Sequence, residues 1–100
     1  MNDNVIQGKE MLLGEKLIKG IELTRKDGLA VSIQEATWQL INPDGTTTQE
    51  APANISGAKV SAMVEPTQIG KNAIVFTTTL TDGQVEKTVL VFQVNEFSII

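Results

Sequence analysis

Residues 71–97 read KNAIVFTTTLTDGQVEKTVLVFQVNEF, two runs rich in β-branched residues on either side of Asp82-Gly83. A two-residue Asp-Gly loop between alternating apolar runs is a strong local signal for a β-hairpin. We expect a type I′ turn, which requires a positive φ at both Asp82 and Gly83. Alternation with a period of two predicts the inward-facing side chains of the two strands, which are Ile74, Phe76, Thr78, Leu80, Thr88, Leu90, Phe92 and Val94.

The second strand of this hairpin is also apolar on its other face, through Val85, Val89 and Val91. A strand that is apolar on both faces is typical of the interior of a sheet. We therefore expect this strand to lie inside a sheet, or to have its outer face covered by another part of the chain.

Two further stretches alternate in the same way, residues 34–42 (QEATWQLIN) and residues 57–66 (GAKVSAMVEP). A turn follows the first stretch at Pro43-Asp44-Gly45, and Pro66 ends the second because proline cannot donate to a sheet ladder. Residues 46–50, TTTQE, are expected to form a short polar edge strand. The inward-facing side chains are predicted to be Ala36, Trp38, Leu40, Ala58, Val60, Ala62 and Val64.

The first third of the chain is open to two interpretations. Residues 17–28, LIKGIELTRKDG, predict a strand that ends in a turn at Asp27-Gly28. Residues 9–19 also contain helix-forming residues, so a helix there is the alternative; the alternation elsewhere favours the strand. Residues 1–8 are expected to be frayed. The inward face of the strand is predicted to carry Leu17, Ile21 and Leu23.

Trp38 is the only tryptophan of the chain, and it has two readings. It could be a platform on which a sugar or a base stacks. It could instead be a core residue on a central strand, and the apolar neighbours Ala36 and Leu40 on the same face favour this. Taken together, the stretches predict one domain over residues 1–100, an all-β immunoglobulin-like sandwich of about seven antiparallel strands.

Charge and composition exclude several classes of function. With 8 Lys and Arg against 12 Asp and Glu, the net charge of −4 argues against binding to nucleic acid or to anionic lipid. The chain has no Cys and no His, which excludes Ser-His-Asp and Cys-His catalysis and structural zinc sites. It shows no signal-peptide pattern and no apolar run of about 20 residues, so we expect synthesis in the cytoplasm and no membrane segment.

Asp27, Asp44 and Asp82 each precede a glycine, which raises the question of a calcium site. A calcium loop brings several oxygen ligands together within a few residues, and none of these aspartates has a second acidic residue within two positions. Turn geometry explains each of them. No metal ligand, no cofactor-binding residue and no catalytic residue is predicted.

The chain ends in NEFSII, where Phe97, Ile99 and Ile100 are apolar. Chain ends are usually polar, and an exposed apolar patch marks an interaction site in many proteins. Either the last strand extends and buries these side chains, or they dock on a neighbouring copy. Phe97, Ile99 and Ile100 are therefore the candidate interface.

The order of these motifs resembles the small immunoglobulin-like β-sandwich proteins of tailed bacteriophages and prophages, including the amino-terminal domain type of baseplate upper proteins. The resemblance covers about residues 10–95 and rests on DGLAVSIQEATWQLINPDG followed by SGAKVSAMVEPTQIGKNAIVFTTTLTDGQVEKTVLVFQV. It includes no catalytic signature. Unlike antibody domains, the chain has no cysteine pair against which Trp38 could pack.

The resemblance implies a non-enzymatic structural or accessory protein of the virion that acts as a protein–protein interaction module. Its expected partners are other virion proteins or further copies of itself, with no nucleic acid and no membrane, and its expected location is the virion. The alternative is an adhesion-type immunoglobulin-like module that binds a carbohydrate or a protein at a cell surface.

Overall fold

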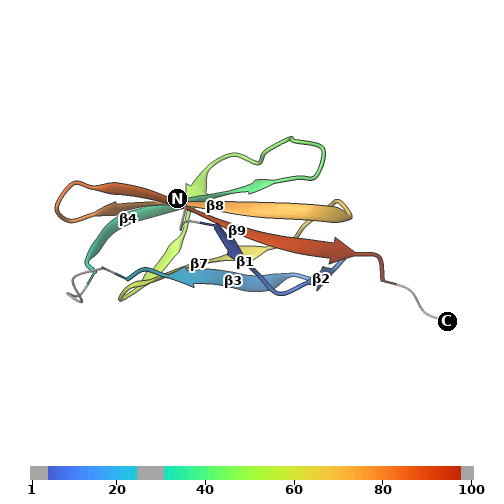
Figure 1. Cartoon of the computed structure of the whole chain (residues 1–100), viewed down its shortest axis with the longest axis horizontal. Coiled ribbons are helices and arrows are strands. Elements are labelled where there is room, and N and C mark those ends of the chain that lie inside the picture. The colour runs from blue at the N-terminus through green and yellow to red at the C-terminus, as the bar shows by residue number, and fades with distance from the viewer. Residues whose placement is uncertain (1–4, 25–30, 98–100) are drawn as a thin grey trace.

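A computed structural model describes residues 5–24 and 31–97, and the regular structure of these residues is made of β-strands (Figure 1). The elements are β1 (Val5–Gln7), β2 (Met11–Leu12), β3 (Leu17–Glu22), β4 (Ile33–Ile41), β5 (Ala51–Pro52), β6 (Asn54–Ser56), β7 (Lys59–Val64), β8 (Gly70–Leu80) and β9 (Val85–Asn95). The molecule is elongated, with extents of 51 × 25 × 24 Å.

The strands form two sheets, which is the sandwich predicted from the sequence. The larger sheet has six strands in the order β1-β9-β8-β4-β5, with β2 also paired to β9, and the smaller sheet has the order β3-β7-β6. This division of strands between two facing layers is an immunoglobulin-like arrangement. Figure 1 shows the two layers, with β1 and β2 along one side of the sandwich.

The amino-terminal strands correct two expectations. Both β1 and β2 pair with β9 in parallel, so the sheet is not purely antiparallel. The register places Val5 beside Val89, and a hydrogen bond of 2.6 Å from the amide of Gly8 to the carbonyl of Val91 continues the contact. The frayed end expected for residues 1–8 is therefore wrong for Val5–Gln7. Because β8 pairs with its other side, β9 lies inside the sheet, as its two apolar faces predicted.

The hairpin of β8 and β9 has the predicted strands but a different turn. Gly83 has a φ of +94°, whereas no described residue other than glycine has a positive φ, so Asp82 does not adopt the type I′ conformation. The amide of Gly83 donates to the carbonyl of Leu80, at 2.9 Å, and the amide of Leu80 donates to the carbonyl of Gln84, at 2.8 Å. This is a three-residue loop in which a type I turn is followed by a left-handed glycine.

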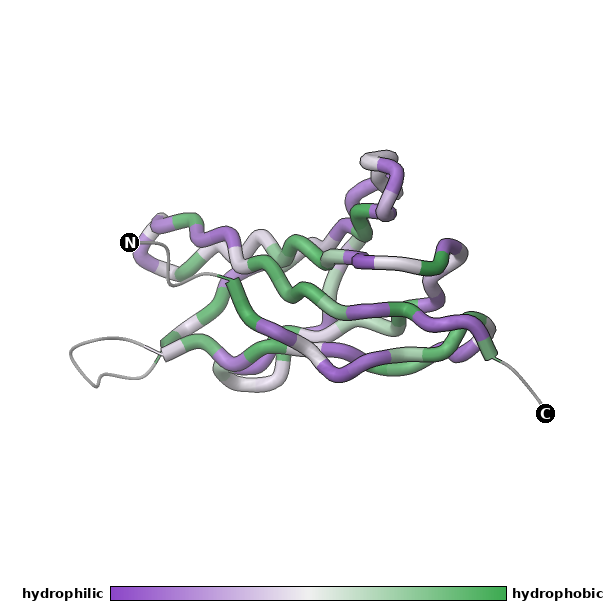
Figure 2. The backbone as a smooth tube through the Cα atoms, turned by 45° about the vertical axis from the view of Figure 1, so that its right-hand side comes forward, coloured by the Kyte–Doolittle hydropathy of each residue, from purple (hydrophilic) through white to green (hydrophobic). Residues whose placement is uncertain are grey.

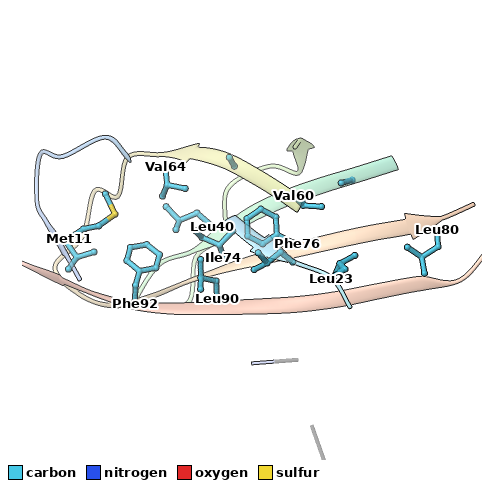
Figure 3. Packing of buried hydrophobic residues seen from close by; sticks show 14 residues of the cluster. Met11, Leu23, Leu40, Val60, Val64, Ile74, Phe76, Leu80, Leu90 and Phe92 are labelled. Carbon is cyan, nitrogen blue, oxygen red and sulfur yellow. The ribbon is translucent and has the colours of Figure 1, made fainter. Parts of the chain in front are cut away.

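The core lies between the sheets, and the predicted inward faces account for most of it. Figure 3 shows side chains of β7 on one side facing side chains of β8 and β9 on the other, with Met11 at one end. Figure 2 shows hydrophobic residues in runs along the strands, with hydrophilic residues between the runs. The buried hydrophobic residues are Met11, Ile21, Leu23, Ala36, Leu40, Val60, Ala62, Val64, Ile74, Phe76, Leu80, Leu90, Phe92 and Val94.

In the first third, the strand interpretation is confirmed and the helix over residues 9–19 is wrong. Leu17 was predicted to face inward, but it is 40% exposed at the end of β3, while Lys19 on the same face is buried. The predicted turn at Asp27-Gly28 lies outside the described residues. The edge strand expected over residues 46–50 is also wrong, because only an isolated bridge between Ile41 and Thr47 forms there and β5 begins at Ala51.

Candidate functional site

Within residues 5–24 and 31–97, strand β3 lies at an edge of the smaller sheet and pairs with β7 on one side only. The amide of Leu23 donates to the carbonyl of Ala58, at 2.9 Å, which continues the ladder between β3 and β7. Hydrogen-bonded pairs alternate along an antiparallel ladder, so the odd-numbered residues of β3 direct their amide and carbonyl groups toward β7. Ile18, Gly20 and Glu22 therefore direct theirs toward the open edge.

Three apolar side chains lie exposed at the carboxyl end of β7 and the beginning of β3. Ile18 is 67% exposed, the largest fraction for a large hydrophobic residue within the described parts of the chain. Met63, its register partner on β7, is 47% exposed on the same face of the sheet. Leu17 is also exposed, as noted above. Since Leu17 lies on the opposite face of β3, we call Ile18 and Met63 the apolar patch.

Next to the apolar patch, the outer face of the smaller sheet is hollowed at Gly20. This glycine faces Ser61 across the ladder, and a methyl group in its place would lie 2.7 Å from the carbonyl oxygen of Val60. The hollow is therefore a consequence of a close backbone approach that excludes a side chain. Beyond it, Glu22 and Lys59 face each other as the next outward pair. The face is thus apolar at one end and charged at the other.

Lys19 occupies the middle of β3 on the inner face and is only 9% exposed. Its Nζ donates to the carbonyl of Lys9, at 2.7 Å, and lies 4.9 Å from the centre of the Phe92 ring. Burial lowers the pKa of the Lys19 ammonium below its usual value, the nearby charge of Lys9 lowers it further, and Glu15 partly opposes both effects. The side chain joins β3 to the segment between β1 and β2, and it satisfies its charge inside the molecule.

Trp38 lies on β4 and is partly buried, packed against the core residues. Its register partner on β8 is Phe76, which is fully buried. This placement agrees with the interpretation of Trp38 as a core residue.

A polar network joins the turn after β4 to the start of β8, and sequence reasoning missed it. Both oxygens of Asp44 accept hydrogen bonds: Oδ1 from the amide of Thr46, at 3.0 Å, and from its hydroxyl, at 2.6 Å, and Oδ2 from Gln68, at 3.1 Å. These bonds lower the pKa of the Asp44 carboxyl, the hydroxyl of Thr46 contributing most. Asp44 thus acts in the turn, as its Asp-Gly context indicated.

The same network contains Asn72, which is fully buried and donates to the carbonyls of Gln68 and Gly70. Among the residues that the structure describes, neither its Oδ1 nor the buried Oδ1 of Asn42 has a hydrogen-bond donor. Buried amide oxygens of this kind usually accept from an ordered water. The only sequence signal for the network was a buried-side position held by asparagine in an otherwise apolar alternation.

Of the candidate interface at the carboxyl end, the structure describes Phe97 alone. Strand β9 ends at Asn95, and Phe97 beyond it is 58% exposed, so the last strand does not extend to bury this ring. Ile99 and Ile100 lie outside the described residues. A role of Phe97, Ile99 and Ile100 in an interface stays a prediction.

The described residues were compared with the requirements of a metal site and of a membrane-spanning helix. Over residues 5–24 and 31–97, no three His, Cys, Asp or Glu side chains are grouped so that they could hold a metal ion. Within the same ranges, no helix has the length and apolar character needed to cross a membrane.

Comparison with known proteins gives a likeness in structure alone. No family model matches the chain, and no curated protein matches it. The chain is similar to the crystal structure of CopC from Methylosinus trichosporium OB3b, with a TM-score of 0.64 and 12% identity, over 91% of this chain and 88% of that one. At this identity the likeness shows the β-sandwich fold and nothing further.

A second similar structure is a 2,6-sialyltransferase of Photobacterium sp. JT-ISH-224, with a TM-score of 0.46 and 16% identity. The match covers 95% of this chain but only 19% of the sialyltransferase. It carries no argument about this protein.

Proposed function

We propose that this protein is a non-enzymatic interaction module of a tailed bacteriophage or prophage particle, which binds other virion proteins or further copies of itself. The observation that carries the proposal is the open edge of β3 with its apolar patch. Contact surfaces between proteins use such exposed apolar anchors on a rigid scaffold. The motif order described above, which resembles small phage immunoglobulin-like proteins, supports the assignment to a virion.

The mechanism would be passive. The two sheets and their shared core hold the edge of β3 in an extended conformation before any partner arrives, so little ordering entropy is lost on binding. Backbone groups at the edge would give affinity to an incoming strand, and the side chains of the apolar patch would give it selectivity. The candidate interface at Phe97, Ile99 and Ile100 would provide a second contact on the same particle.

The proposal is tested on particles released by the strain that encodes the chain. Particles are purified on a density gradient, and their proteins are quantified by mass spectrometry against a labelled standard of this chain. We expect a fixed ratio of this chain to the major structural protein across the particle peak. A chain found only in the soluble fraction, and absent from the particle peak, overturns the proposal.

The alternative is an adhesion-type module that binds carbohydrate or protein at a cell surface. The loops that join the strands at the ends of the sandwich would form its binding site, as they do in immunoglobulin-like variable domains. A glycan array separates the two functions. Binding to a defined glycan that is lost when loop residues are altered, and kept when Ile18 is altered, would favour the adhesion module.

A further inference from the structure

We propose that β3 is a strand-addition site for β3 of a second copy of this chain. The two strands would pair in antiparallel fashion about a two-fold axis, which joins two β3-β7-β6 sheets into one continuous sheet of six strands. The inference rests on the proposed function as an interaction module and names one partner for it. It concerns the isolated protein, so it can fail while the chain still belongs to a virion.

The edge of β3 differs from the other edges of the described sheets in length. At the far edge of the same sheet β6 has 3 residues, whereas β3 has 6. At the edges of the larger sheet β5 has 2 residues, β1 has 3 and β2 has 2. The ladder between β3 and β7 runs without a register shift from Leu17 to Glu22. Neither a bulge nor a proline interrupts β3, and these are two of the devices by which proteins protect an open edge.

An inward-pointing lysine on an edge strand is a third such device, and Lys19 is an inward-pointing lysine in the middle of β3. A lysine of this kind blocks pairing when its ammonium must leave through the edge to reach water. Here the ammonium is already bonded to the carbonyl of Lys9 and lies over the ring of Phe92. A second strand beside β3 therefore would not strip the charge of its partners.

The pattern of β3 selects one two-fold register. Centred on Gly20, the register pairs Leu17 with Leu23 of the second copy and Ile18 with Glu22, so the whole strand is used. Ile18, Gly20 and Glu22 exchange the main-chain hydrogen bonds, which are the groups left open by β7. Centred on Lys19 instead, the register would place Leu23 opposite Glu15, which lies before the start of β3, so the paired segment would be shorter.

Cysteine cross-linking tests the register directly, since the chain has no cysteine of its own. Residues facing each other in a hydrogen-bonded antiparallel pair have Cα atoms about 5.5 Å apart, within the range that a disulfide bridges. Under mild oxidation the double variant Ile18→Cys, Glu22→Cys is expected to form a covalent dimer. The single variant Ile18→Cys is the control, because in this register position 18 of one copy faces position 22 of the other copy and not position 18.

Charge variants test the contact without a covalent bond. Ile18→Glu places a carboxylate opposite Glu22 of the second copy, whereas Ile18→Lys places an ammonium there. In sedimentation velocity at increasing concentration, we expect Ile18→Glu to weaken dimerisation by about tenfold or more and Ile18→Lys to keep it. Val85→Glu is the matched control, since Val85 is 58% exposed on β9 in the larger sheet, and it should leave dimerisation unchanged.

Circular dichroism and thermal melting establish that each variant is folded before association is compared. A wild-type chain that stays monomeric at all concentrations, together with no cross-linking of the double variant, overturns the inference. So does equal loss of dimerisation in Ile18→Glu and Ile18→Lys, or cross-linking of the single Ile18→Cys variant as strong as that of the double one. None of these results bears on whether the chain is found in purified particles, which the mass-spectrometric experiment decides.

Discussion

The substitution Gly20→Ala sets two opposing effects against each other, and the structure decides between them. Gly20 lies in β3 and does not have a positive φ, so alanine can adopt its backbone conformation. On that ground alone the substitution would stabilise the protein by about 0.4–1 kcal/mol, because alanine restricts the unfolded chain more than glycine does. The added methyl group, however, has no space on the outer face of the sheet.

A Cβ at position 20 would lie 2.7 Å from the carbonyl oxygen of Val60 and 2.9 Å from the Cβ of Ser61. Both atoms belong to β7, the central strand of the smaller sheet, where Val60 is fully buried, so they cannot move away without disturbing the core. Overpacking of this kind costs about 1–3 kcal/mol. The net expectation is a loss of about 1.5 kcal/mol in the free energy of unfolding.

Urea denaturation at low protein concentration, followed by the fluorescence of Trp38, measures this free energy. Thermal melting should show a decrease of roughly 6–12 °C in the melting temperature for a domain of this size. Gly8→Ala is the matched control. At position 8 the nearest atom to an added Cβ is Cδ1 of the buried Leu90, at 3.1 Å, which is a milder contact than the one of 2.7 Å at position 20. We expect this variant to lose less than about 1 kcal/mol. A Gly20→Ala protein as stable as the wild type would refute the reasoning.

Three further outcomes follow from the described contacts. Burial lowers the pKa of Lys19 in the folded protein below its usual value of 10.5, so at a pH between the folded and the unfolded pKa the unfolded chain binds more protons than the folded one. The free energy of unfolding of the wild type, relative to that of Lys19→Met, should therefore rise as the pH rises between these two pKa values. A difference between the two proteins that does not depend on pH would contradict this. The pKa of Asp44 in the folded protein is lowered from its usual value of 3.8, so the carboxylate stabilises the fold above pH 3.8 and this contribution is lost as the pH falls through the folded pKa. Acid unfolding followed by circular dichroism should therefore be less steep in Asp44→Asn than in the wild type. Deletion of residues 97–100 should leave the melting temperature unchanged, since Phe97 is exposed beyond the end of β9; a lower degree of association in sedimentation would support the interface at Phe97, Ile99 and Ile100, and unchanged association would count against it.

The inward faces of the long strands could be predicted because alternation is a local property. Phe76 and Leu80 on β8, and Leu90 and Phe92 on β9, are buried as their spacing indicated. Successive side chains of a strand point to opposite faces, so a period of two in hydropathy identifies the buried face without knowledge of its neighbours. The same argument holds for Val60 on β7.

Other features could not be predicted because they depend on contacts between distant residues. Lys19 interrupts the apolar face of β3, and only the carbonyl of Lys9 and the ring of Phe92 explain why an ammonium is tolerated there. The parallel pairing of β1 with β9 joins residues more than 80 positions apart, as in Val5 and Val89. A segment of three residues such as Val5–Gln7 is too short to show an alternation from which such a pairing could be inferred.

The sequence by itself determined the class of the fold, the positions of the main strands and the side of each strand that is buried, since these follow from local alternation and from turn residues such as Gly83. Only the tertiary structure decided which strands are neighbours outside the β8-β9 hairpin, and therefore that β3 has an open edge bearing the exposed Ile18. The physical reason is that side-chain direction is set within one strand, whereas the use of backbone amide and carbonyl groups is set by whichever strand lies beside it.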